Sequence, residues 1–375
     1  MLKIRANDMM NTEKNLRISR KGKETRARRE MQEARIYKIK FDKNKISNEK
    51  LQKIKRLFLE GKWFTNYMMA KGINELVSYK DYKIRKVEVK VKDAFENREL
   101  NILSSQMKEY LITRLQSNTK TIQTLNKSGH KTGKMKYMKA LHSIPLMQYN
   151  NTYYVNKKRK IVRVQGLGDF KAIGLNQMPD NSELTAADLI ERNGDYFIHV
   201  TAYTPKEERV HNKKAIGIDF GIKNQAAFSN GIKVQYAIPV SERIKSLSKA
   251  FSRAEYNEET KASSKRRQKL RNKMNKEFEH QNRQKIDINN KIAHYITANY
   301  QYVAYQNDCI HAWEKLYGRR IYQTAIGGLR DAFERKANTP TEVGRFVKTT
   351  GVCMNCGKVS KLNLSDRVFE CPFCK

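Results

Sequence analysis

The sequence predicts an α+β protein with several domains, and three observations support this prediction. The chain has 375 residues, more than one ordinary domain needs. Short strand-like runs with Gly and Asn turns lie between long helical segments. Four of the five cysteines fall within the last 23 residues, which is typical of a metal-binding module in a reducing compartment. We therefore expect a β-barrel with inserted helices, a second domain around a buried strand, and a terminal cysteine module.

The charge balance indicates a polyanionic partner. The chain carries 76 Lys and Arg residues against 38 Asp and Glu residues, a formal charge of +38. Self-repulsion at this charge opposes compaction, and binding to nucleic acid removes that cost. The competing interpretation is a basic protein without a dedicated ligand. No run approaches the roughly 20 apolar residues of a membrane span. The N-terminus also lacks an apolar signal region, so we expect a cytoplasmic protein that contacts no membrane.

The first half of the chain is predicted to divide into a basic tail and a barrel. Residues 1–34 are polar and basic without apolar periodicity, which predicts a tail that orders on a partner or a solvated arm without function. Residues 35–210 begin with a strand at Arg35–Phe41, and Ser47 then caps a helix. A helical region is expected to be inserted at about 47–145. Four further runs are expected to be short strands: Thr152–Val155, Lys160–Val164, Lys171–Gly174 and Tyr196–Tyr203.

The second half is predicted to hold one sheet domain, residues 211–345, and the cysteine module, residues 346–375. Ala215–Asp219 has the pattern of a buried strand that ends in a carboxylate. An Asp at the end of a strand is by itself a weak indication of function, because such residues are common turn formers. The other expected elements are strands at Ala226–Phe228, Lys233–Ile238 and Gln301–Tyr305, and helical segments over Ser241–Asn299 and Gln323–Lys336.

The cysteine module carries the strongest chemical signal. Cys353-Met-Asn-Cys356 and Cys371-Pro-Phe-Cys374 are two C-x-x-C knuckles separated by 14 residues. Tetrahedral Zn²⁺ needs four ligands, and each knuckle supplies two thiolates. A structural Zn²⁺ is therefore predicted, with redox use of the cysteines as the competing interpretation. Cys309 stands apart and is expected to be a buried thiol.

The order of these motifs resembles the TnpB family, which are transposon-encoded RNA-guided nucleases related to type V CRISPR effectors. The segments that carry the resemblance are IGIDFGIKN around Asp219, the helical QNRQKIDINNKIAHYI, and TTGVCMNCGKVSKLNLSDRVFECPFCK around the cysteines. The resemblance covers about residues 30–374 and is most specific after about residue 211. It implies a wedge β-barrel with inserted recognition helices, a RuvC-like domain of the RNase H fold, and a C-terminal zinc ribbon with four cysteine ligands.

The chain departs from the TnpB pattern where the family has its catalytic carboxylates. Two-metal phosphodiester hydrolysis needs several converging carboxylates. Asp219 matches the first, but VAYQND puts Gln306 where the family has Glu, and the sequence stops at Lys375, before the family's third carboxylate. Asp308 would be displaced from Gln306 by about 6–7 Å along an extended strand. No catalytic Mg²⁺ is therefore expected. The combination resembles TldR, the nuclease-dead TnpB-like repressors, and implies that the chain is not an enzyme.

Two groups of residues are predicted to contact nucleic acid. One dense basic segment could clamp phosphates, and its members are Lys265, Arg266, Arg267, Lys269, Arg271 and Lys273. A solvated charge run is the competing interpretation. The resemblance also implies that the barrel region reads a short motif beside the target, and amides can pair with adenine. The candidates there are Trp63, Phe64, Asn66 and Gln106, although core packing and capping would explain the same residues.

The resemblance implies an RNA-guided DNA-binding protein that represses transcription by occupying guide-matched DNA beside a short motif, without cleaving it. Its partners would be a guide RNA and double-stranded DNA. It would be located in the bacterial cytoplasm, at the nucleoid. Two other functions stay open at this point. One is an active or residual TnpB-type endonuclease that uses Asp219 with Asp308 or with a substrate phosphate. The other is a non-guided RNA-binding protein that assists transposition.

Overall fold

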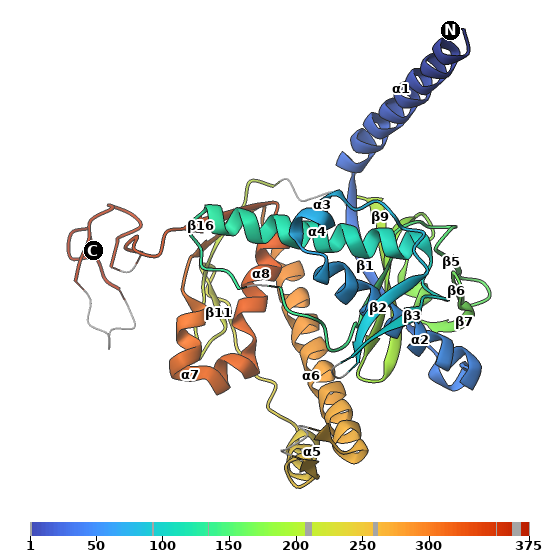
Figure 1. Ribbon diagram of the computed structural model, residues 1–375. Coiled ribbons are helices and arrows are strands. Elements are labelled where there is room, and N and C mark those ends of the chain that lie inside the picture. The colour runs from blue at the N-terminus through green and yellow to red at the C-terminus, as the bar shows by residue number, and fades with distance from the viewer. Residues whose placement is uncertain are drawn as a thin grey trace. The chain divides into compact units, whose positions relative to one another are not determined.

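The computed structural model describes residues 2–91, 94–133, 135–206, 212–257, 262–349, 351–361 and 369–374. The chain divides into two compact units, Met1–Glu207 and Glu208–Lys375. Each unit has its own β-sheet and its own buried core, and Figure 1 labels many of their helices and strands. No helix among the described residues is long and apolar enough to cross a membrane.

The first unit is built on a seven-stranded antiparallel sheet, with the strand order β4-β8-β9-β1-β7-β6-β5. Its strands are β1 (Gln32–Phe41), β4 (Ser143–Leu146), β5 (Tyr153–Asn156), β6 (Ile161–Val164), β7 (Gly168–Ile173), β8 (Glu183–Arg192) and β9 (Asp195–Pro205). The two edge strands approach each other, because an isolated bridge joins Tyr149, just beyond β4, to Tyr153 of β5. The sheet is therefore a nearly closed barrel, in agreement with the fold class predicted from the sequence.

Helices and one hairpin occupy the connection between β1 and β4. They are η1 (Lys43–Lys45), α2 (Asn48–Ala70), α3 (Ile73–Ser78), the hairpin of β2 (Lys86–Val91) and β3 (Ala94–Glu99), and α4 (Ser105–Lys127); η2 (Leu175–Gln177) follows β7. The hydroxyls of Ser47 and Ser104 accept hydrogen bonds from the N–H groups of Lys50 and Met107, which caps α2 and α4. Just after α4, Gly129 takes a φ of 80°, a left-handed conformation that ends helices readily.

The core of the first unit is apolar and includes one satisfied carboxylate. The rings of Phe41 and Phe170 stack with centroids 4.7 Å apart. Glu60 is fully buried, and its carboxylate accepts hydrogen bonds from Arg56 and from the backbone of Ile102 and Leu103. A buried charge with this many donors avoids most of the cost of desolvation. The residues of α2 and α4 that are fully buried in this core include Ile54, Leu57, Phe64, Met68, Met107 and Ile112.

Three features of the first unit differ from the sequence expectations. Residues Leu2–Glu30 form a helix, α1, in place of an irregular tail. Most of these residues have ordinary helix propensity, and pairs such as Arg20–Glu24 stabilise a helix without an apolar face. β1 begins at Gln32 because its first residues pair with the end of β9. The strands β2, β3, β4 and β8 were not predicted. Polar residues interrupt the alternation of β3 and β8, β4 is short and contains Pro145, and the regular alternation of β2 was overlooked.

The second unit contains a five-stranded mixed sheet with the order β12-β11-β10-β15-β16. Its strands are β10 (Ala215–Asp219), β11 (Ala226–Phe228), β12 (Lys233–Val234), β15 (Tyr302–Gln306) and β16 (Thr339–Val343). β11 runs antiparallel to β10, whereas β15 runs parallel to β10 and β16 runs parallel to β15. β10 is therefore the central strand, and the carboxyl ends of β10, β15 and β16 share one edge of the sheet.

Four helices accompany this sheet: α5 (Glu242–Ser252), α6 (Lys265–Thr297), α7 (Ile310–Thr324) and α8 (Ile326–Lys336). The helical stretch predicted over Ser241–Asn299 is two helices, separated by the short hairpin of β13 (Tyr256–Asn257) and β14 (Ala262–Ser263). Phe333 of α8 is fully buried, and its ring lies 6.0 Å from that of Phe228. The helix therefore packs its apolar side into the core beside the sheet.

Buried polar side chains fix α6 in the second unit. Gln281, Lys285 and Asn289 follow one another at four-residue spacing and lie on one face of the helix. Each donates a hydrogen bond to a backbone carbonyl outside α6. Burial lowers the pKa of Lys285, because removal from water disfavours the charged form of its amine. The second half of α6 is therefore held by directional bonds as well as by apolar packing.

Candidate functional site

The residues predicted at the catalytic positions lie at the carboxyl edge of the central sheet. β10 and β15 pair in parallel, with Ile218 opposite Tyr305. The next residue on each strand is Asp219 or Gln306, so these two side chains end neighbouring strands. Asp219 is exposed and Gln306 is half-buried. The fold therefore brings the two positions together at one edge.

Asp308 lies nearer to this edge than a straight strand would place it. β15 ends at Gln306, and the chain then turns: the N–H of Asp308 donates to the carbonyl of Gln306 at 2.9 Å. The displacement expected for an extended strand therefore does not apply. Desolvation by the surrounding protein, and next the charge of Asp308, raises the pKa of Asp219 even though its side chain reaches solvent. The two carboxylates are electrostatic neighbours.

Two arginines near Asp308 were not identified from the sequence. Desolvation raises the pKa of Asp308, and the positive charges of Arg345 and Arg330 oppose that shift. Arg330 of α8 donates to the backbone carbonyl of Asp308 at 3.1 Å, and Arg345 donates to that of Asn307 at 3.3 Å. These arginines are more than twenty residues from Asp308, so no local sequence pattern could have indicated them. The edge of the sheet therefore carries both carboxylates and guanidinium groups.

The side chain of Gln306 is used for hydrogen bonding within the protein. Its amide nitrogen Nε2 donates to the carbonyl of Arg345 at 2.9 Å and to that of Val347 at 3.3 Å. Its oxygen Oε1 accepts a longer hydrogen bond, 3.4 Å, from the Thr349 hydroxyl. A glutamate at this position could accept such bonds but could not donate them. Gln306 therefore ties the end of β15 to the segment after β16.

Within the described part of the chain, the carboxyl edge of the sheet does not bring together three His, Cys, Asp or Glu side chains that could hold a metal ion. Among the described residues, the four cysteines are the one group of at least three His, Cys, Asp or Glu side chains close enough to hold an ion. Two-metal hydrolysis places cations on both the attacking and the leaving oxygen, and several carboxylates must hold them. Asp219 and Asp308 supply two at most.

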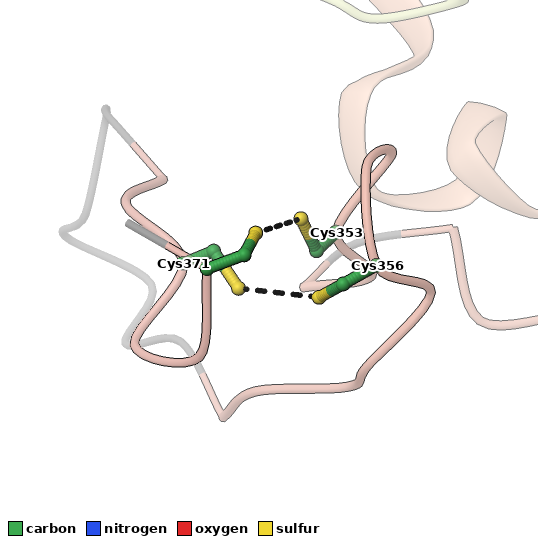
Figure 2. Close-up of side chains that lie close together, drawn as sticks. Cys353, Cys356 and Cys371 are labelled. Carbon is green, nitrogen blue, oxygen red and sulfur yellow. Dashed lines mark hydrogen bonds between the residues drawn. The ribbon is translucent and has the colours of Figure 1, made fainter.

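The two cysteine knuckles converge (Figure 2). The sulfur atoms of Cys353 and Cys374 are 3.5 Å apart, and those of Cys356 and Cys371 are 3.6 Å apart. All four lie within 4.8 Å of one another. A tetrahedron with Zn–S bonds of about 2.3 Å has edges of about 3.8 Å, so this donor set fits a zinc ion. Disulfides would need sulfur atoms about 2.05 Å apart, and these thiols are free.

Local backbone geometry prepares the first knuckle for a metal. The N–H of Gly357 donates to the carbonyl of Cys353 at 2.9 Å, and Gly357 takes a φ of 69°, which favours glycine. The backbone N–H groups of Cys356 and then Asn355 lower the pKa of the Cys353 thiol to about 6. The lowered pKa favours the thiolate of Cys353, the form that binds Zn²⁺. Cys309, outside the cluster, is half-buried at the start of α7.

The predicted basic cluster lies on the first turns of α6, where five of its six members are exposed: Lys265, Arg266, Lys269, Arg271 and Lys273. Arg267 differs, because its guanidinium lies 4.2 Å from the ring centre of Phe251 and 5.2 Å from that of Tyr256. It also donates to the carbonyl of Ala254 at 2.8 Å. Arg271 also lies over Phe251, with its guanidinium 5.4 Å from the ring centre, although its side chain is exposed. Arg267 therefore holds α6 against α5 with help from Arg271, and the four remaining cations are exposed to a ligand.

The four candidates of the first unit are engaged inside the protein. Phe64 is fully buried, and Trp63 is nearly so beneath Arg56, whose guanidinium is 4.8 Å from the ring centre. Asn66 exchanges two hydrogen bonds with the backbone of Met138, and Gln106 accepts one from Gln165. These contacts agree with core packing and capping, the competing interpretation. Asn66 and Gln106 remain half-buried, so their contact with nucleic acid stays a prediction.

Comparisons with known proteins give a family match over part of the chain and likenesses to solved structures. A family model described as a probable transposase (OrfB_IS605) matches residues 198–307, less than a third of the chain. That segment includes Asp219 and Gln306. No curated protein matches the sequence. A chain from the "Cryo-EM structure of the Cas12f1-sgRNA-target DNA complex" aligns with a TM-score of 0.48 and 11% identity, over 87% of this chain and 80% of that chain.

Proposed function

We propose that this chain is an RNA-guided DNA-binding protein of the TnpB type that represses transcription by occupying its target without cleaving it. The observation that carries the proposal is the hydrogen bonding of the Gln306 side chain. At the position where the TnpB resemblance expects a metal-binding Glu, the chain has an amide that donates to two backbone carbonyls. The amide nitrogen does not bind a cation and the amide oxygen brings no negative charge, so this edge is poorly suited to two Mg²⁺ ions.

The domain assignments form part of the same proposal. Residues 35–210 would be the wedge barrel with its recognition helices, 211–345 a catalytically incomplete RuvC-like domain, and 346–375 a zinc ribbon. The nearly closed barrel, the central strand that ends in Asp219, and the converging cysteines support these assignments. The +38 charge and the exposed cations of α6 support a nucleic-acid partner.

The proposal is tested with matched guide RNA and target DNA in the presence of Mg²⁺. We expect tight, guide-dependent binding of the duplex and no strand scission on a denaturing gel. Guide-dependent cleavage would contradict the repressor function. Sequencing of the RNA that co-purifies with the full chain separates guided from non-guided binding. A structured RNA with one variable end indicates a guide, whereas a mixed pool indicates non-specific RNA binding.

A second candidate function, residual nuclease activity, is favoured by the proximity of Asp308 to Asp219. The turn after β15 places a second carboxylate within electrostatic range of the first. If the chain cuts DNA with this pair, Asp219→Ala and Asp308→Ala each abolish cleavage. Asp287→Ala, an exposed substitution on α6, removes the same charge elsewhere and leaves cleavage unchanged. Activity that survives both edge substitutions would exclude this site as its source.

The proposed binding of phosphates by α6 predicts a change in salt dependence. Replacing Lys265, Lys269 and Lys273 with Gln should weaken binding equally across target sequences. The slope of log affinity against log salt should fall by up to about 0.9 for each duplex phosphate that a lysine no longer neutralises. The matched control replaces the same three lysines with Arg, which keeps the charge and should keep the slope. An unchanged slope in the Gln variant would remove α6 from the interface.

A further inference from the structure

The segment that follows β16 depends on polar contacts for its position. Residues 344–349 are all exposed, and Phe346 is 93% exposed, so this segment has no apolar anchor of its own. Its internal turn is closed by a hydrogen bond from the N–H of Val347 to the carbonyl of Gly344, 3.0 Å. It lies between the sheet and the first cysteine of the cluster, Cys353. A contact that fixes residues 344–349 therefore also fixes part of the chain between the sheet and the cysteine module.

Gln306 supplies most of the contacts that hold this segment. Both of its amide donors are used on carbonyls two residues apart, those of Arg345 and Val347, and its oxygen accepts from Thr349. The guanidinium of Arg345 adds a bond to the carbonyl of Asn307, beside Gln306. One side chain at the end of β15 thus reaches three alternate residues of the segment.

We propose that Gln306 is a positioning residue that clamps residues 345–349 to the end of β15, and that a glutamate cannot take over this role. An ionised glutamate has no N–H, so it would place a negative charge against two carbonyl oxygens that now accept hydrogen bonds. Replacing Gln306 with Glu therefore adds a carboxylate to the edge and releases the segment at the same time. This clamp is independent of whether the chain cleaves DNA.

Trypsin provides a direct test, because Arg345 and Lys348 both lie in the clamped segment. The full chain is digested in the presence of Zn²⁺, and the cuts are located by mass spectrometry. In Gln306→Glu and Gln306→Met we expect cleavage after these two residues to be about tenfold faster, as expected for the loss of one or two hydrogen bonds. Gln284→Glu, an exposed change on α6, adds the same charge in the same unit and should leave both rates unchanged.

The pattern of cuts decides among the outcomes. Faster cleavage confined to Arg345 and Lys348 supports the clamp. Unchanged rates in both Gln306 variants overturn it, as does an acceleration in Gln306→Glu that Gln306→Met does not share, since charge alone would then explain the effect. Faster cleavage throughout the second unit also overturns it, because Gln306 would then support the whole fold. The proposed repressor function has a separate readout, strand scission of guide-matched DNA.

Discussion

The cysteine cluster and the carboxyl edge of the sheet are two candidate metal sites that are built in opposite ways. The cluster has a complete set of four donors, but the described residues around it have few buried side chains. The edge has an incomplete set of donors on a well-packed sheet. A metal would therefore organise the first site, whereas the second keeps its geometry through strand pairing, core packing and side-chain hydrogen bonds. In this chain the site with the complete set of ligands is therefore not the site with the well-packed scaffold.

The largest effect should follow the removal of zinc. Chelation, or Cys356→Ser, should remove the fold of the cysteine module, because structural zinc sites supply on the order of 10 kcal/mol of apparent folding free energy. Hydrogen exchange should show decreased protection at residues 351–361 while β10 and β15 stay protected. Elemental analysis should find one Zn²⁺ per chain. Equal protection of the module with and without zinc would show that packing, and not the metal, holds it.

A substitution in the core should instead lower the unfolding free energy of the sheet in the second unit. Phe333→Ala removes a fully buried ring that contacts Phe228 and Phe220, and should cost about 3–5 kcal/mol of unfolding free energy. Urea unfolding can be followed by Trp313 fluorescence in a Trp63→Phe background, since the chain has two tryptophans. Phe346→Ala, at a 93% exposed ring, is the control and should change the value by less than about 0.5 kcal/mol. Similar losses in both variants would refute the proposed core.

The smallest effect concerns the charge at the sheet edge. The pKa of Asp219 is raised on folding, so its contribution to stability is present at low pH and is lost as pH rises through the folded pKa. Asp219→Asn should therefore stabilise the protein at neutral pH, by less than about 1 kcal/mol because the side chain is exposed to solvent. The gain should disappear in acid, below the pKa of the unfolded state. Thermal unfolding as a function of pH measures it.

A second aspartate gives a control of opposite sign. A hydrogen bond from Arg163 lowers the pKa of Asp169, so its stabilisation is present at neutral pH and lost in acid. Asp169→Asn should therefore destabilise the protein slightly at neutral pH. If both substitutions shift the unfolding temperature in the same direction, the electrostatic description of the edge is wrong.

The sequence predicted the sites that local spacing encodes. Two C-x-x-C knuckles suffice to predict the convergence of the cysteines, and the apolar run before Asp219 suffices to predict β10. The displacement expected for Asp308 assumed a straight strand, whereas the chain turns after β15 and Arg330 of α8 adds a bond to the carbonyl of Asp308. Arg267 looked like its exposed neighbours, yet the aromatic rings of Phe251 and Tyr256 engage it. Such contacts arise from tertiary structure, and no short window of sequence contains them.

The construction of α6 has a mechanical consequence. Its 33 residues span about 50 Å. One half carries exposed cations, and the other half is bonded to backbone carbonyls through Gln281, Lys285 and Asn289. The first turns are thus held only by contacts with α5 and the residues after it, whereas the second half is bonded into the core of the unit. Under the proposed function, a polyanion bound at the first turns would be connected through one continuous helix to the core beside β10 and β15.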